Sequence, residues 1–440
     1  MKLLSLIAII LILPLSIISA EDPFGDIFSD TEQDAGISDS SPETSSDGIK
    51  IDFSGVISTE IFYFFDAAQV QDNEVIFRPE ADLNIKASNS FMEGIVSLNL
   101  SPQKWITRPE TIRTDTLNEL YLRSFFSIGY LEAGLMKVEW GSADGIHVLD
   151  PLSYWDLTDG FSFDVISLKK AGEMVKMNFH VKETGLLELV YKPFFSSHIM
   201  AQEGRWSIGT ENIPNLHVPD TTTLEYSQAA MRFTSTINGF DLGAQYYYGY
   251  LPEPGITTDG TDFYLAYDRA HLFGLEGGTS LGIFTFWLEA GYWLTEDIQG
   301  DDPTVHNNRI VYLPGFDFTV PQTKLYFNIQ LMGDYTLKTD NLSIGDVDDP
   351  TGNGTPAHNN ILLVAGDYSF NKDKTKIRLG GMWSIEENSY IIMPEFLWYF
   401  NDYLDFSISG QIIDGQGGKN GMLQSWKNND NLKVKLSYTF

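Results

Sequence analysis

The sequence predicts an all-β protein, a transmembrane antiparallel β-barrel of about 18 strands. Three observations support this fold class. The chain begins with an export-type segment, its later residues alternate apolar and polar side chains with a period of two, and the connections between alternating segments are short and long in turn. The expected organisation is a signal peptide over 1–20, an acidic disordered tail over 21–48 and a barrel with long external loops over 49–440.

The first twenty residues have the order of a secretory signal. Lys2 gives a short positive region, an apolar run extends from Leu3 to Ile18, and Ala20 is the small residue expected before a cleavage site. The alternative, an uncleaved anchor helix, is disfavoured by Pro14 and because the run is shorter than the roughly 20 residues that span a bilayer. We therefore expect cleavage after Ala20 and export to the bacterial outer membrane.

The segment 21–48 is acidic and has few apolar side chains. It contains nine Asp and Glu residues and neither Lys nor Arg. Such a segment buries too little apolar surface to fold alone, which predicts a disordered periplasmic tail. The alternative is that residues 22–28 bind a partner or close the pore.

Composition fits a barrel and excludes other classes. Aromatic residues form 13% of the chain although its mean hydropathy is only −0.13, as expected of strands with one lipid-facing and one water-facing side. The formal net charge of −32 makes nucleic acid a poor partner, because its binding needs a basic surface. The absence of Cys excludes a lipid-anchored lipoprotein and a disulfide framework. A large soluble secreted β-protein has similar totals and stays the alternative on composition alone.

The alternation is clearest in the last strand. Its predicted lipid-facing side consists of Leu432, Val434, Leu436, Tyr438 and Phe440. The other side carries Lys433, Lys435, Ser437 and Thr439. This ending resembles the aromatic-ended last strand that the barrel-insertion machinery recognises. The resemblance implies that Leu436, Tyr438 and Phe440 form the assembly signal and that this machinery is a partner.

The connections indicate how many strands there are. Eight short connections, such as 237–240 and 400–403, alternate with nine mostly long ones, such as 139–170, 194–223, 338–358 and 415–429. A barrel with short periplasmic turns and long external loops has this alternation, and a sandwich does not need it. The connections imply 18 strands with both termini in the periplasm, and 16 is the nearest alternative. A barrel this wide must hold water or a plug in its lumen.

One segment, residues 131–152, resembles a family of poorly characterised outer-membrane porin-like β-barrels. In that family a strand with a central Gly runs into Trp-Gly, and an Asn-Pro or Asp-Pro pair follows. The matching positions are Gly134, Trp140, Gly141, Asp150 and Pro151. The match covers about 25 residues, and the rest of the chain is similar only in barrel layout. Some members are thought to move lipids or other hydrophobic compounds, so the resemblance adds a lipid-transport option to the porin interpretation.

The residues themselves favour a loop that folds back into the barrel over 139–170. Trp155, Phe161 and Phe163 give this long connection apolar groups to bury. The expected pore constriction consists of Lys137, Glu139, Trp140, Gly141, Asp144, Asp150, Asp156 and Asp159. The alternative is that the Trp-Gly pair is only an aromatic at the membrane interface, where aromatic girdles lie.

The phase of the alternation places a mixed set of charges inside the barrel. The predicted lumen-lining residues are Glu60, Glu93, Glu119, Arg123, Glu289, Arg378, Glu395, Lys433 and Lys435. Charges on a wet lumen wall can select solutes. The alternative is that they pair across strands and stabilise the wall.

No catalytic or metal motif stands out. The seven His residues are scattered, there is no Gly-x-Ser-x-Gly motif, and the acidic loop 340–354 lacks the regular spacing of a calcium loop. We therefore expect no enzyme activity, no cofactor and no metal site. The leading hypothesis is a passive channel for small or hydrophobic solutes in the lipid bilayer. The alternatives are an adhesin or binding barrel with a sealed lumen, which would use loops 194–223 and 338–358, a lipid transporter, and a barrel enzyme, which no motif supports. A homotrimer is a possible assembly.

Overall fold

The computed structural model describes residues 48–66, 74–107, 115–162, 164–201, 203–207, 215–349, 357–415 and 422–440. The predicted signal peptide, the acidic tail up to residue 47 and Phe163 lie outside these residues. Within them the chain forms one closed sheet of 18 antiparallel strands, which confirms the predicted fold class and strand number.

The wall strands and the remaining elements have the following bounds. The wall consists of β1 (Lys50–Phe64), β2 (Val75–Ser88), β3 (Met92–Leu100), β4 (Leu117–Phe126), β5 (Gly129–Met136), β8 (Gly172–Val181), β9 (Gly185–Lys192), β11 (Gln228–Ile237), β12 (Phe240–Tyr250), β15 (Arg269–Leu281), β16 (Phe284–Thr295), β17 (Arg309–Thr319), β18 (Leu325–Thr336), β19 (His358–Phe370), β20 (Thr375–Ser384), β21 (Ser389–Tyr399), β22 (Leu404–Gly415) and β23 (Asn431–Thr439). The connections contain α3 (Pro102–Thr107), β6 (Tyr154–Trp155), α5 (Val165–Leu168), β7 (Lys169–Lys170), β10 (Leu216–His217), η3 (Leu224–Tyr226), β13 (Gly255–Thr258), β14 (Phe263–Ala266), η4 (Thr339–Asn341) and α6 (Met422–Ser425).

Each wall strand pairs with the next along the chain, and β1 pairs with β23 to close the ring. The closing pair extends from Val56 opposite Thr439 to Phe64 opposite Asn431. Beyond it, the backbone of Phe440 exchanges two hydrogen bonds of 2.9 Å with Gly55. The barrel therefore has no free sheet edge, which removes the unpaired donors and acceptors that an open sheet would expose.

Side chains alternate between the two faces of the wall as the sequence predicts. On β16, Phe286 and Leu288 are exposed on the outer face, whereas Trp287 and Glu289 point inward and are buried. The short turns use residues that tolerate a left-handed backbone, such as Asn238 and Gly239 with φ values of 54° and 82°. This alternation produces an apolar outside and a largely polar inside.

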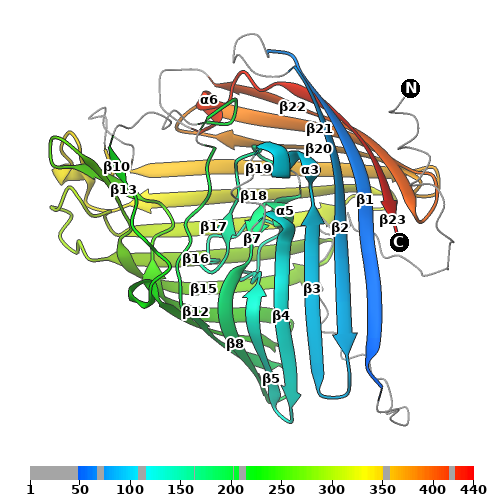
Figure 1. Cartoon of the computed structure of the whole chain (residues 1–440), viewed down its shortest axis with the longest axis horizontal. Helices are drawn as coiled ribbons and strands as arrows, with labels where there is room; N and C mark the ends of the chain where they lie inside the picture. Colours follow the sequence, from blue (N-terminus) through cyan, green and yellow to red (C-terminus); the bar gives the residue numbers. More distant parts are fainter. Residues whose placement is uncertain are drawn as a thin grey trace.

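Among the described residues, three segments of the connections fold into the barrel. The first joins β5 to β8, spans 137–171 and is called the interior loop here; the others are 193–207 and 422–429. Figure 1 shows α5 and β7 of the interior loop between the β1–β5 part of the wall and the β15–β19 part. Together with the wall, these segments bury two apolar clusters.

Two of these segments differ from the sequence-based expectation, which placed 194–223 and 415–429 among the external loops. The reason is apolar burial. Trp206 and Trp426 pack edge to face with ring centroids 5.2 Å apart, and Trp426 is completely buried. The indole Nε1 of Trp426 also donates a 2.8 Å hydrogen bond to the Trp206 carbonyl oxygen. Within the described residues, no helix is long and apolar enough to cross a membrane.

Candidate functional site

The interior loop crosses the lumen and is held by polar side chains from several parts of the wall. Gln330 of β18 donates to the carbonyl oxygen of Asp144 at 2.7 Å, and Gln245 of β12 donates to that of Leu149 at 2.6 Å. Gln411 of β22 donates at 2.6 Å to the carbonyl oxygen of Phe161. Because β18 is eight strands along the ring from β5, where the loop begins, the loop reaches the opposite wall.

Glu289 is the main anchor of the loop on β16. Its Oε1 accepts hydrogen bonds from the backbone nitrogen of Ala143 at 2.9 Å and lies 2.8 Å from Nδ1 of His147. Its Oε2 accepts from the backbone nitrogen of Val148 at 2.9 Å. Glu289 is fully buried, so these loop groups replace the water that its carboxylate would otherwise need.

The loop also carries its own charge network. His147 lies between Glu289 and Glu139. Nε2 of His147 is 3.0 Å from Oε1 of Glu139. Burial alone would lower the pKa of His147, but the hydrogen bonds to Glu139 and Glu289 outweigh it and raise the pKa to about 9. Burial would raise the pKa of Glu139, yet His147 and Lys169 lower it to about 2. Lys169 in turn binds Asp150 at 2.8 Å.

Trp140 and Gly141 explain the local shape of the loop. Trp140 is completely buried in one of the interior clusters, whereas the alternative interpretation places it among aromatic side chains at the membrane interface. Gly141 has a φ of 133°, and a Cβ there would lie 2.2 Å from both Glu289 Oε1 and His147 Nδ1. Only glycine fits this position without displacing the anchor. Arg232 of β11 donates to the Gly141 carbonyl oxygen at 3.2 Å.

Two further predicted constriction acids, Asp156 and Asp159, are paired with cations. Asp156 lies 3.4 Å from Nζ of Lys170, and Asp159 lies 3.1 Å from a guanidinium nitrogen of Arg78 on β2. Asp159 also lies 3.8 Å from Nζ of Lys104 in α3. The structure thus brings Glu139, Gly141 and Asp150 together around His147 and Lys169, and it places Asp156 and Asp159 against other cations.

The predicted lumen-lining charges on β1, β20, β21 and β23 form cross-strand pairs. Oε1 of Glu60 lies 3.6 Å from Lys433 Nζ and 3.4 Å from Lys435 Nζ. Arg378 lies 3.4 Å from Glu395. These contacts match the alternative interpretation, in which the charges pair across strands and stabilise the wall. Likewise, on β4, Glu119 accepts a 2.8 Å hydrogen bond from the backbone nitrogen of Lys137, where the interior loop starts.

Glu93 and Arg123 belong to a longer array that the sequence did not reveal. Acidic and basic side chains alternate along it, with neighbouring nitrogen–oxygen distances between 2.6 and 3.7 Å. This charge ladder consists of Lys86, Glu93, Arg123, Glu132, Lys176, Glu188, Arg232 and Glu276. Knowledge of the strand register would have revealed it, because each member lies on the inward phase of its strand.

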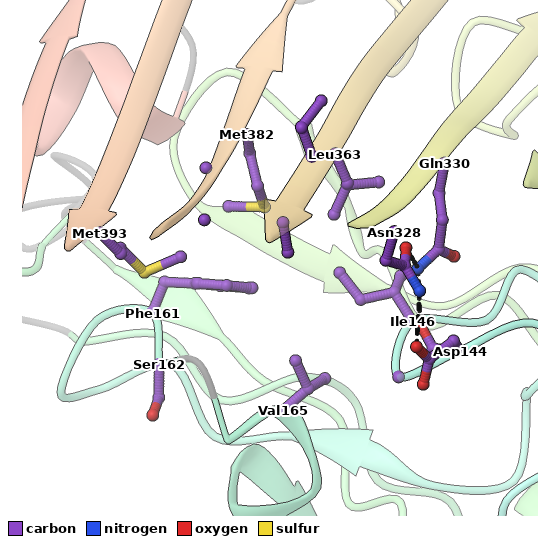
Figure 2. Close-up of a pocket in the computed structure, with 15 residues that line it drawn as sticks. Asp144, Ile146, Phe161, Ser162, Val165, Asn328, Gln330, Leu363, Met382 and Met393 are labelled. Atoms are coloured by element: carbon purple, nitrogen blue, oxygen red, sulfur yellow. Dashed lines mark hydrogen bonds between the residues drawn. The ribbon is translucent and has the colours of Figure 1, made fainter. Parts of the chain in front are cut away.

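A narrow apolar pocket lies between the interior loop and strands β18 to β21. Figure 2 shows Phe161 of the loop opposite Met382 and Met393 of the wall. The pocket holds about 440 Å³ of empty space, part of which is open to solvent. Its polar end is formed by Asp144, whose Oδ2 accepts a 2.6 Å hydrogen bond from Asn328. The pocket therefore has an apolar body and one polar end.

Comparison with known proteins extends the description of the fold. No protein-family model and no curated protein matches this sequence. The outer membrane protein OpdK of Pseudomonas aeruginosa has a similar structure, with 11% identity, a TM-score of 0.51 and coverage of 89% of this chain and 99% of OpdK.

Two further solved structures are more distant. OmpF of Salmonella typhi, solved in complex with daunomycin, has 11% identity, a TM-score of 0.45 and coverage of 91% of this chain and all of OmpF. The outer membrane channel DcaP of Acinetobacter baumannii has 9% identity, a TM-score of 0.44 and coverage of 90% and 99%. At such identities, the likeness to OpdK shows a shared barrel fold.

Proposed function

We propose that this protein is an outer-membrane channel for passive diffusion of small or hydrophobic solutes, and that the interior loop narrows its lumen. The observation that carries the proposal is a closed barrel whose lumen is crossed by a loop anchored on Glu289. Solutes would move down their gradient between this loop and the wall. The proposal includes neither a reaction nor a cofactor.

The outer surface supports a place in a lipid bilayer. Large apolar side chains such as Leu122, Leu275 and Leu379 are more than half exposed on the outer face of the wall. Soluble proteins rarely expose such a continuous apolar surface. Phe284 and Phe316 pack edge to face with ring centroids 6.2 Å apart, and both lie near the short turns, as the aromatic residues of an interfacial girdle would.

The inner surface supports passage of water and solutes. The charge ladder and the pairs at Glu60 and Arg378 give the wall a polar inner side, which an apolar core would not need. Most of these charges are paired. The width of the lumen and the interior loop would therefore limit the passage of solutes more strongly than any single charge.

Planar-bilayer recording of the purified, folded protein tests the proposal. Discrete conductance steps are the expected result, and a salt gradient would give cation selectivity if the net charge of −32 acts on the lumen. The absence of conductance would refute the channel, provided that circular dichroism and heat-modifiable migration on gels show the protein to be folded. The same preparation, cross-linked before electrophoresis, tests whether the barrel assembles as a homotrimer.

A sealed binding barrel is the second candidate, and the apolar clusters favour it. Trp206, Trp426 and Phe64 pack with the interior loop at the centre of one of these clusters. In that case the protein would bind a ligand through its external loops and never conduct. Deletion of residues 339–349, which leaves the interior loop intact, would then abolish ligand binding, whereas a channel would keep its conductance.

A further inference from the structure

We infer that the pocket between the interior loop and β18–β21 is a binding subsite for a neutral amphiphile with one alkyl chain and a hydroxyl head. The inference deepens the proposed function, because it rests on solutes entering the lumen and names a class of them. It depends on the shape of the pocket, on one buried acceptor and on the charge beside that acceptor.

The body of the pocket is apolar on both sides. The wall contributes Leu363 of β19, Met382 of β20 and Met393 of β21, and the interior loop contributes Ile146 and Phe161. Thioether side chains are unbranched and flexible, so they can separate to admit a guest and close around it. A narrow slot of this kind fits a linear alkyl chain better than a bulky ring system.

The polar end offers a hydrogen-bond acceptor. Gln330 is only 4% exposed, and its Nε2 donates to the Asp144 carbonyl oxygen at 2.7 Å and to Asn328 Oδ1 at 3.0 Å. These two bonds fix the orientation of the amide, and its Oε1 is buried without a hydrogen-bond partner. A buried acceptor of this kind is stabilised when a ligand brings a donor, so a hydroxyl group suits this end.

The neighbouring charge excludes an anionic head. The Asp144 carboxylate lines the same end of the pocket and accepts from Asn328. A second carboxylate placed there would meet a like charge in a poorly solvated site. The pocket therefore favours a neutral alcohol over the fatty acid of the same length.

Photo-cross-linking of the full chain in lipid nanodiscs tests the inference. The probe is an alkyl alcohol with a diazirine in its chain, and labelled peptides are mapped by mass spectrometry. We expect labels in 361–365 and 382–393 of the wall and in 161–165 of the loop, displaced by excess 1-octanol and not by octanoate. Labels spread evenly over outward-facing residues, or equal displacement by octanoate, would overturn the inference.

Two variants locate the label, and one is a matched control. Met382→Trp fills the slot and should abolish the specific label. Gln330→Met removes the acceptor and should weaken labelling roughly three- to tenfold, as loss of one hydrogen bond does. Gln245→Met is the control. Gln245 is similarly buried, donates to a loop carbonyl oxygen and has an Oε1 without a hydrogen-bond partner, but it lies outside the pocket.

The outcomes separate this inference from the proposed function. Labelling reports occupancy of the pocket and needs no conduction, whereas planar-bilayer recording reports conduction and needs no ligand. Unchanged labelling in Met382→Trp would overturn the subsite even if the barrel conducts. A label that behaves as expected in a barrel that never conducts would support the subsite and refute the diffusion channel.

Discussion

Nδ1 of His147 lies 2.8 Å from Oε1 of Glu289, although 142 residues separate them in the sequence. The first residue belongs to the interior loop and the second to β16. The position of the loop in the lumen is therefore fixed by β16, which is not adjacent to β5 or β8, the strands at the two ends of the loop. Changes at either residue should alter conduction while leaving the wall intact.

Glu289→Gln should release the loop and raise the single-channel conductance. The substitution leaves an amide that cannot accept from Ala143, Val148 and His147 as the carboxylate does, and each unsatisfied buried group costs about 1–3 kcal/mol. The control is Glu395→Gln, which removes an inward acid that pairs with Arg378 instead of the loop. Equal conductance in both variants would contradict the anchoring role.

Conductance should depend on pH through His147. Its pKa is raised to about 9 from 6.5, so its contribution to anchoring is complete below 6.5 and is lost as pH rises through 9. The pKa of Glu139 is lowered to about 2 from 4.5, so its contribution is present above 4.5 and lost as pH falls toward 2. The loop should be held best between these limits.

Recordings of wild type and His147→Gln across this range test the pH dependence. Wild-type current should become larger or noisier above pH 9. The variant, which cannot carry the charge between Glu139 and Glu289, should show no such step. A step of the same size in the variant would assign the titration to other groups.

Gly141→Ala should dislodge the loop because its Cβ would lie 2.2 Å from two anchor atoms, in addition to the strain of a φ of 133°. Gly239→Ala is the control, since its φ of 82° is also unfavourable for alanine but nothing lies within 4 Å of the added atom. We expect proteolysis within 137–171 to accelerate only in the first variant. Equal rates of proteolysis in the two variants would show that the contact at Gly141 tolerates a methyl group.

Glu60→Gln should weaken closure of the barrel. Glu60 is the shared partner of Lys433 and Lys435 across the β1–β23 seam, and its loss should cost about 1.5–3 kcal/mol in the free energy of unfolding. Asp52→Asn removes an exposed ion pair with Lys50 and should cost less than about 1 kcal/mol. Urea titration of the folded protein measures both changes. Equal losses would remove the special role of the seam.

Deletion of Phe440 should reduce insertion into the outer membrane. Its backbone exchanges hydrogen bonds with Gly55 and its ring lies 5.4 Å from that of Phe53, so both the proposed assembly signal and the end of the seam are lost. The measurement is the fraction of heat-modifiable protein in outer-membrane extracts of a bacterial host. Tyr438→Phe keeps an aromatic at the neighbouring outward position and should insert normally.

The sequence predicts the wall well because the strand period decides which side each residue faces. The alternation from Leu432 to Phe440 shows this, since the residues of β23 have the predicted faces. The inward phase also selects Glu289. The strand period does not predict which residues contact Glu289, because those contacts depend on how a loop remote in the sequence folds across the lumen.

Trp206 and Trp426 were missed for a related reason. Both lie in connections without a period, where local pattern does not distinguish an external loop from one that returns to the interior. Their burial follows from contact with each other and with Phe64, which are far apart in the sequence. The pocket could not be predicted from the sequence for the same reason, because it forms only where the interior loop contacts the wall.

The distance in sequence between the interior loop and its supports has a consequence for biogenesis. Its contacts with Glu289, Asn328 and Gln411 join residues separated by 141 to 250 positions. The loop precedes β16, β18 and β22, which carry these residues, in the chain. Contacts of such separation form late and slowly. The loop therefore takes its final position only after β16, β18 and β22 have joined the ring, so the wall and the interior are completed together.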